Sequence, residues 1–124
     1  MVERYCVQRS GGNGGLRVTV SRAQAEYAGV LPPVTMYARE NRGALELVTW
    51  RELVHGVETT SLLSARHVRL RHRPSRACYE VGIPALYVLR AGLKPPDRKR
   101  GLAGSVVTVE ARKGVLVIHK VNDG

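Results

Sequence analysis

The chain has 124 residues, 44% of them apolar and 24% charged, which is the composition of one globular domain. Twenty Lys and Arg stand against ten Asp and Glu, for a net charge of +10. No apolar run approaches the roughly 18 residues needed to span a bilayer, and the amino terminus lacks the apolar stretch of a signal peptide. We therefore expect a soluble, cytoplasmic protein.

The first half of the chain predicts two strand pairs around one short helix. Ser21, with Gln24 three residues later, forms a capping-box pattern that begins a helix. Gly29 ends this helix, because glycine readily adopts the left-handed conformation found after helices. In chain order we predict a strand over 4–8, a glycine turn over 10–15, a strand over 16–20, the helix over 22–28, a strand over 34–37, a turn over 40–43 and a strand over 44–48.

The second half repeats this order. Residues 18–33 match residues 81–96, 63 positions later, with five identical pairs, and residues 43–47 match residues 114–118. Such self-similarity marks a repeated structural unit. The predicted elements are strands over 66–71 and 76–83, a helix over 85–91 with Pro84 in its first turn and Gly92 after its end, and strands over 107–111 and 115–121. An insert over 97–106 has no counterpart in the first half.

Each repeat would be only marginally stable alone, since about fifty residues bury too little apolar surface. We therefore expect the first unit, residues 1–48, and the second unit, residues 66–121, to share one core. Residues 49–65 join them as a linker, in which 51–54 form one helical turn. The predicted fold class is mostly β with two short helices. Phe is absent, so aliphatic Val and Leu must supply the packing.

The second unit carries a short motif, Val81-Gly82-Ile83-Pro84, Leu89, Gly92-Leu93-Lys94-Pro95 and Asp97, followed by Gly114-Val115-Leu116-Val117-Ile118. With the order of elements, this motif resembles the AbrB-like (SpoVT/AbrB) swapped-hairpin family of DNA-binding transcription regulators. In that family two units interlock their hairpins into one barrel, and basic residues of the first hairpin and helix start hold DNA. The resemblance implies an intramolecular swapped-hairpin β-barrel here, a pseudo-dimer of two βαβ-type AbrB-like units.

The chain also departs from the family pattern. Pro96-Asp97 stands where the family usually has Gly-Asp, and Ser21 stands where it has the Pro that opens the helix. Tandem units occur in the MraZ subfamily, but the D-x-x-x-R signature of that subfamily is missing. The resemblance therefore bears on the fold more than on the cellular role.

Basic side chains are concentrated in the second half. Residues 1–63 hold seven basic and six acidic side chains, whereas residues 64–124 hold thirteen and four. Such a distribution indicates a polyanion binder, most simply a nucleic-acid binder, although acidic proteins and membrane surfaces also attract cations. Sixteen of the twenty cations are Arg, whose planar group suits phosphate, but a GC-rich genome or a hot habitat also raises the Arg content.

The densest cations follow the strand predicted over 66–71. The two-residue period of a strand places the aliphatic residues on one face and the arginines on the other, spaced roughly 6 to 7 Å apart. This spacing matches successive phosphates, so we favour nucleic-acid contact over a solvated edge strand that cations protect from pairing. The candidate contacts are Arg69, Arg71, Arg73 and Arg76.

Two smaller groups of cations extend this surface. The insert should be a mobile, glycine-flanked loop that either contacts phosphates or is only solvated. Three arginines of the first unit lie at the corresponding hairpin and helix start, but the glycine tip of that hairpin carries no charge. We therefore expect asymmetric binding in which the second unit contributes most affinity. The candidate contacts are Arg98, Lys99 and Arg100 in the insert, and Arg9, Arg17 and Arg22 in the first unit.

Cysteine and histidine spacing predicts neither a metal site nor a cofactor. Cys6 and Cys78 are the only cysteines, and we expect free buried thiols, with a bridge between the units as the alternative. The histidines are scattered along the chain: His55, His67, His72 and His119. The chain lacks a phosphate-binding glycine loop, a nucleophile elbow and a close acidic pair, so we expect no enzyme.

These patterns together predict a protein that binds duplex DNA, a nucleoid-associated transcription regulator that could form a homodimer or a higher oligomer. Two alternatives from other classes remain open. One is an RNA- or ribosome-associated binding module, and the other is an antitoxin-type protein-interaction module.

Overall fold

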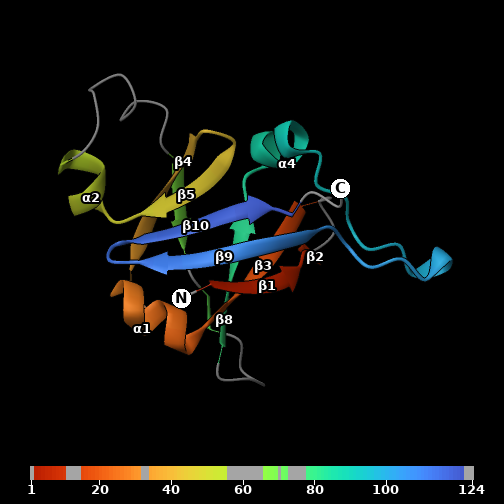
Figure 1. Cartoon of the computed structure of the whole chain (residues 1–124), viewed down its shortest axis with the longest axis horizontal. Coiled ribbons are helices and arrows are strands. Elements are labelled where there is room, and N and C mark those ends of the chain that lie inside the picture. The colour runs from red at the N-terminus through yellow and green to blue at the C-terminus, as the bar shows by residue number, and fades with distance from the viewer. Residues whose placement is uncertain are drawn as a thin grey trace.

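The computed structural model describes residues 2–10, 15–31, 34–55, 66–69, 71–72 and 78–121. As predicted, the chain is mostly β, with short helices beside two antiparallel sheets (Figure 1). Sheet A consists, in spatial order, of β1 (Val2–Cys6), β9 (Val106–Arg112), β10 (Val115–Lys120), β5 (Ala44–Val48), β4 (Thr35–Asn41) and β6 (Arg66–Arg69). Sheet B consists of β2 (Gln8–Ser10), β3 (Gly15–Ser21), β8 (Cys78–Ile83) and β7 (Arg71–His72).

The predicted closed barrel is not formed by the described strands, whose ladders make two separate sheets. Both strands expected to be continuous, over 4–8 and over 66–71, are instead divided between the sheets. β1 pairs with β9 in sheet A, whereas β2, which follows after Val7, pairs with β3 in sheet B. The N–H of Val7 still donates to the carbonyl of Ser105, the residue before β9, at 2.9 Å, so the change of sheet comes between Val7 and Gln8. Bends of this kind let one strand pass between two packed sheets.

The central strands join the two repeats through matching residues. β3 and β8 run antiparallel, and Val18 lies opposite Val81, its counterpart 63 positions later. In sheet A, β5 and β10 behave in the same way, because Glu46 lies opposite its counterpart Val117. A strand that pairs with its own repeat about the matched residue has the register that a twofold axis between the two units would produce.

The edge strands are exchanged between the units. β1 of the first unit pairs with β9 of the second, and β6 of the second unit pairs with β4 of the first. Each unit therefore completes the ladder of the other. Neither unit supplies the whole of sheet A or of sheet B by itself.

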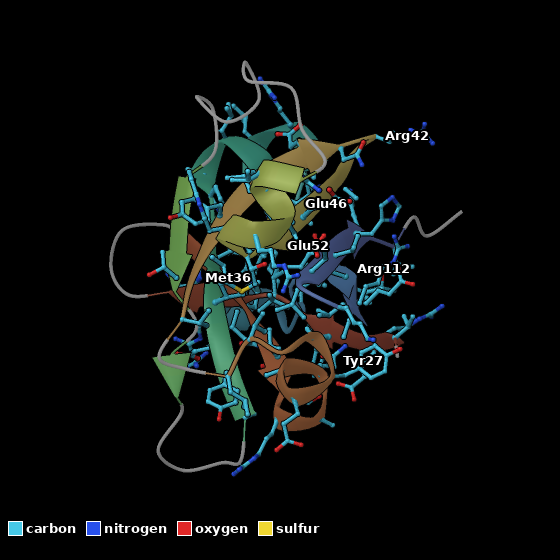
Figure 2. All side chains as sticks on the ribbon, turned by 90° about the vertical axis from the view of Figure 1, so that its left-hand side faces the viewer. Tyr27, Met36, Arg42, Glu46, Glu52 and Arg112 are labelled. Carbon is cyan, nitrogen blue, oxygen red and sulfur yellow. The ribbon has the colours of Figure 1, made fainter. Side chains whose placement is uncertain are left out.

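The core lies between the two sheets and is aliphatic, as the absence of Phe requires. Both sheets contribute alternating residues, and Figure 2 shows Met36 of β4 pointing into this interior. Its fully buried members include Val7, Val18, Val20, Val30, Met36, Leu47, Val107, Val109, Leu116 and Ile118. Val48 and Leu53 are buried outside this cluster, where α2 (Trp50–His55), the helical turn predicted in the linker, packs against β4 and β5.

The two remaining helices are anchored to the sheets by polar side chains. Ser21 caps α1 (Arg22–Ala28) as predicted, since its hydroxyl accepts the N–H of Gln24 at 3.1 Å. The capping box is not completed, because Gln24 is fully buried and its Nε2 donates to the carbonyl of Val109 at 2.6 Å. In α4 (Ala85–Ala91) the counterpart of Gln24 is Tyr87, whose hydroxyl donates to the carbonyl of Ile118 at 3.2 Å.

Both helices end as the sequence predicts. Gly29 and Gly92 adopt left-handed φ angles of 74° and 66°, and each donates its N–H to carbonyls of the last helical turn. The helix bounds also match the prediction. Pro84 differs by one position, because it is the N-cap of α4 and the helix begins at Ala85.

Val18→Ala is expected to destabilise the protein by about 2 kcal/mol, because it removes two buried methyl groups where the repeats meet and leaves a cavity. Equilibrium unfolding in urea measures this change. Val2→Ala is the control: Val2 also lies in a strand but is 59% exposed, so its loss should cost less than about 0.5 kcal/mol. Equal effects of the two substitutions would contradict the central position of Val18.

Candidate nucleic-acid interface

Sheet B turns one face to the core and the other outward. Along β3 the even-numbered residues are buried, so Arg17 and Thr19 lie on the outer face. Register places Gly82 opposite Arg17 and Glu80 opposite Thr19. A Cβ added at Gly82 would meet no atom within 4 Å. No side chain therefore covers the outer face at Gly82, which leaves open space beside the Arg17 side chain.

An ion pair lies at the centre of this face. Arg17 Nε is 3.1 Å from the Glu80 carboxylate, and the two side chains are 29% and 24% exposed. Residue 80 is the counterpart of residue 17 in the repeat, so two matching positions carry opposite charges and meet across the axis. In a dimer of identical units the same positions would bring like charges together. We expect Arg17 to attract an anion less strongly than the sequence alone suggests.

Cations lie beyond both ends of β3, which spans roughly 20 Å at about 3.3 Å per residue. At the end where β3 begins, Arg9 of β2 is exposed and lies opposite Leu16, so it is at the edge of the inner face, whereas Gln8 shares the outer face with Arg17. At the other end Arg22 begins α1 and is also exposed, with a hydrogen bond to Glu26 at 2.9 Å that raises the pKa of the guanidinium. In β7, Arg71 lies opposite Glu80, which is itself opposite Thr19, so the backbone of Arg71 lies beside the central ion pair and not at an end of β3.

The row of arginines predicted over 66–73 is divided by the change of sheet. Arg69 belongs to β6 of sheet A, whereas Arg71 belongs to β7 of sheet B. The prediction of one continuous strand was therefore wrong. The side chains of Arg69 and Arg71 are outside what the structure describes, and Arg73 and Arg76 lie outside the described residues. Their contact with nucleic acid stays a prediction.

The insert forms a defined arm, residues 97–105, and not the mobile loop expected from its glycines. Asp97 and Leu102 exchange two backbone hydrogen bonds of 2.9 Å. The Asp97 carboxylate caps the short helix η1 (Arg98–Arg100) by accepting the N–H groups of Lys99 at 3.1 Å and Arg100 at 3.4 Å. The exposed tip of the arm therefore has an ordered backbone.

Backbone contacts also hold the base of the arm. Ser105 donates its N–H to the Lys94 carbonyl at 3.0 Å, and its hydroxyl accepts the Lys94 N–H at 2.8 Å. At Gly104 a Cβ would overlap the carbonyl oxygen of Val7, so a larger residue would displace the arm. Val7 comes two residues before Arg9. The arm and Arg9 thus belong to the same end of sheet B.

A hydrogen-bonded tyrosine connects β1 to the end of β3. The hydroxyl of Tyr5 donates to the carboxylate of Glu3. Burial, followed by the hydrogen bond and the charge of Glu3, raises the pKa of Tyr5 to about 12, while a hydrogen bond with Ser21 opposes this shift. Tyr5 therefore stays neutral well above pH 7.

Cys6 and Cys78 are free thiols, as expected, but both are half-buried where we predicted full burial. Among the described residues no group of three His, Cys, Asp or Glu side chains could hold a metal ion. None of the helices in the described part of the chain is long and apolar enough to cross a membrane.

An open cleft that sequence reasoning missed lies where α1, α2 and the β9–β10 turn meet. Its volume is about 740 Å³, and its lining is Ala28, Gly29, Thr49, Arg51, Glu52, Lys113 and Gly114. The lining brings together three segments far apart in the sequence, so no local pattern could have revealed it. Figure 2 shows Glu52 of this lining near the middle of the view. The cleft mixes charges of both signs and lacks the purely basic lining of an anion site.

No family model, curated protein or solved structure matches this chain.

Reversing the charges of the central ion pair tests whether the side chains of Arg17 and Glu80 attract each other. Arg17→Glu and Glu80→Arg each place like charges together and are expected to cost about 0.5 to 1 kcal/mol, and the double substitution should recover most of this loss. Urea unfolding of the four proteins gives the coupling energy. Additive losses in the double variant would show that the two side chains do not interact.

Tyr5 should ionise near pH 12, whereas an ordinary tyrosine ionises near pH 10. Because the folded pKa lies above the unfolded one, the contribution of Tyr5 to stability is complete below pH 10 and is lost as the pH rises toward 12. Phenolate absorbance, compared between the wild type and Tyr5→Phe, isolates this titration. A difference spectrum that appears near pH 10 would contradict the combined effect of burial and of Glu3 on the Tyr5 hydroxyl.

Proposed function

We propose that this protein is an AbrB-like swapped-hairpin pseudo-dimer that binds duplex DNA as a transcription regulator. The exchange of β1 and β6 between the units supports the swapped-hairpin arrangement. The pairing of β3 and β8 about Val18 and Val81 supports a twofold relation within one chain. In the family that the sequence resembles, two units interlock their hairpins, usually from separate chains. In this proposal the two units of one chain take their place.

The observation that carries the DNA proposal is the presence of cations at both ends of sheet B, with a neutralised centre between them. The arm, with Arg9 near it, lies at one end and Arg22 lies at the other, while Arg71 lies beside the central Glu80. The roughly 20 Å between the ends exceeds the roughly 12 Å width of the major groove. Such a surface can contact phosphates on both sides of one groove while its uncharged middle lies over the opening.

The second unit supplies most of the affinity in this proposal. Its hairpin carries Arg71, Arg73 and Arg76, and no first-unit position in the corresponding hairpin tip, residues 11–14, is charged. Each phosphate contact releases counterions, so binding should weaken steeply as salt rises.

Titration of fluorescent random-sequence duplex DNA at several salt concentrations tests the proposal, with matched duplex RNA as competitor. We expect DNA affinity to fall linearly with salt on a double-logarithmic plot, with a slope of about −0.9 for each phosphate contacted. Stronger competition by RNA would favour the RNA-binding alternative. Absence of binding to either duplex at low salt would favour a protein-interaction module.

Arg71→Ala combined with Arg73→Ala should reduce the steepness of the salt dependence by about 2 and weaken binding to all sequences. The matched control is Arg51→Ala with Lys113→Ala, which removes the same charge from the open cleft and should change the slope by less than about 1. Circular dichroism verifies that all variants are folded. Identical slopes for the two double variants would show that net charge, and not the hairpin, governs binding.

A further inference from the structure

The arm breaks the symmetry of the two units. It belongs to the second unit alone, because the repeat alignment leaves residues 97–106 without a counterpart. Figure 1 shows it as the light-blue turn that projects to the right of the body. Its base is held by Val7 of the first unit and by Lys94 of the second, so its direction is fixed relative to sheet B. Because only one unit carries the arm, the two sides of the molecule that the repeat relates are not equivalent.

The tip of the arm presents positive charge in several directions. Arg98, Lys99 and Arg100 are consecutive residues of a 3₁₀ turn, which has three residues per turn, so their side chains leave the backbone about 120° apart. All three are exposed, and among the described residues the nearest carboxylate is that of Asp97, 3.9 Å from Arg100 Nε. A flat anionic surface could meet only part of this set. A groove with phosphates on both walls could meet all of it.

An apolar side chain lies directly beside these cations. Leu102 follows the tip and is 56% exposed, so the tip offers an apolar side chain together with its three cations. Proteins that enter the minor groove commonly combine arginines with an apolar side chain that packs against sugars or between bases. The composition of the tip therefore fits the interior of a groove better than the outside of a phosphate backbone.

We propose that the arm inserts into the minor groove of duplex DNA, beside the surface of sheet B, and thereby fixes the direction in which the protein lies on DNA. This inference rests on the proposed DNA-binding function. The minor groove is about 6 Å wide, so cations pointing apart reach both walls, whereas the major groove is about twice as wide. A·T-rich minor grooves are narrower still and concentrate the negative potential that attracts arginine. The ordered backbone of the arm lowers the entropy lost on insertion.

The test uses three homopolymer duplexes and two triple variants of the full chain. Inosine lacks the minor-groove amino group of guanine, so an I·C duplex offers the minor-groove pattern of A·T with a major groove close to that of G·C. The arm variant is Arg98→Ala, Lys99→Ala and Arg100→Ala, with the Asp97 cap retained. The matched variant, Arg4→Ala, Arg51→Ala and Lys113→Ala, removes the same charge from exposed positions outside the arm.

The wild type should bind the A·T and I·C duplexes about tenfold more tightly than the G·C duplex, and the arm variant should lose this preference. The matched variant should weaken binding to all three duplexes by the same factor and keep the preference. If the arm variant loses equal affinity for all three duplexes, or the wild-type preference groups I·C with G·C, minor-groove insertion is wrong. If the wild type binds no duplex, the proposed function itself fails.

Hydroxyl-radical cleavage of a bound duplex gives a second, independent readout. We expect minor-groove protection on one side of the binding site only, and loss of that protection in the arm variant while the rest of the footprint persists. A footprint that is symmetric in the wild type, or unchanged in the arm variant, would overturn the arm inference and leave the proposed function intact.

Discussion

The structure depends on one backbone contact, the antiparallel pairing of β3 with β8 about Val18 and Val81. These strands come from different repeats, and their inward-facing residues form one side of the aliphatic core. Each repeat has about fifty residues, a size at which a domain buries little apolar surface and is only marginally stable by itself. Pairing through matched residues solves this problem, because each unit then covers the apolar face of the other.

This constraint also organises the surface. The same register that places Val18 opposite Val81 brings Arg17 to Glu80 on the outer face, where their opposite charges neutralise each other. Cations then remain at the two ends, at a separation set by the length of β3. Joining both units in one chain lets matched positions differ, which a dimer of identical chains cannot do. Opposite charges at the axis and an arm on one side are both consequences of that freedom.

Features set by local chemistry could be predicted from the sequence. The bounds of α1 and α4 and the glycines that end them follow from residues within one helical turn, as does the β4–β5 turn, where Arg42 and Gly43 have positive φ angles and Arg42 points away from the body (Figure 2). The repeat itself was visible as sequence identity. These signals need no knowledge of what lies across the fold.

Features set by distant residues could not be predicted. The alternation of residues 4–8 is the same whether the strand stays in one sheet or passes to a second at Val7. Gln24 has the pattern of a capping residue, yet its environment under β9 turns it inward to Val109. The order of the arm depends on backbone contacts with Val7 and Lys94, which no local pattern contains. For the candidate site, sequence identified the cations but not their division between two ends.

Native-state hydrogen exchange tests most directly whether the two repeats form one cooperative structure. The slowest amides of β3 and β8 should exchange with the same free energy of opening, equal to that of global unfolding, because neither strand can leave without exposing the shared core. Exchange of one strand at a clearly lower free energy than the other would show that the units open independently. That result would contradict a fold held together at the axis between them.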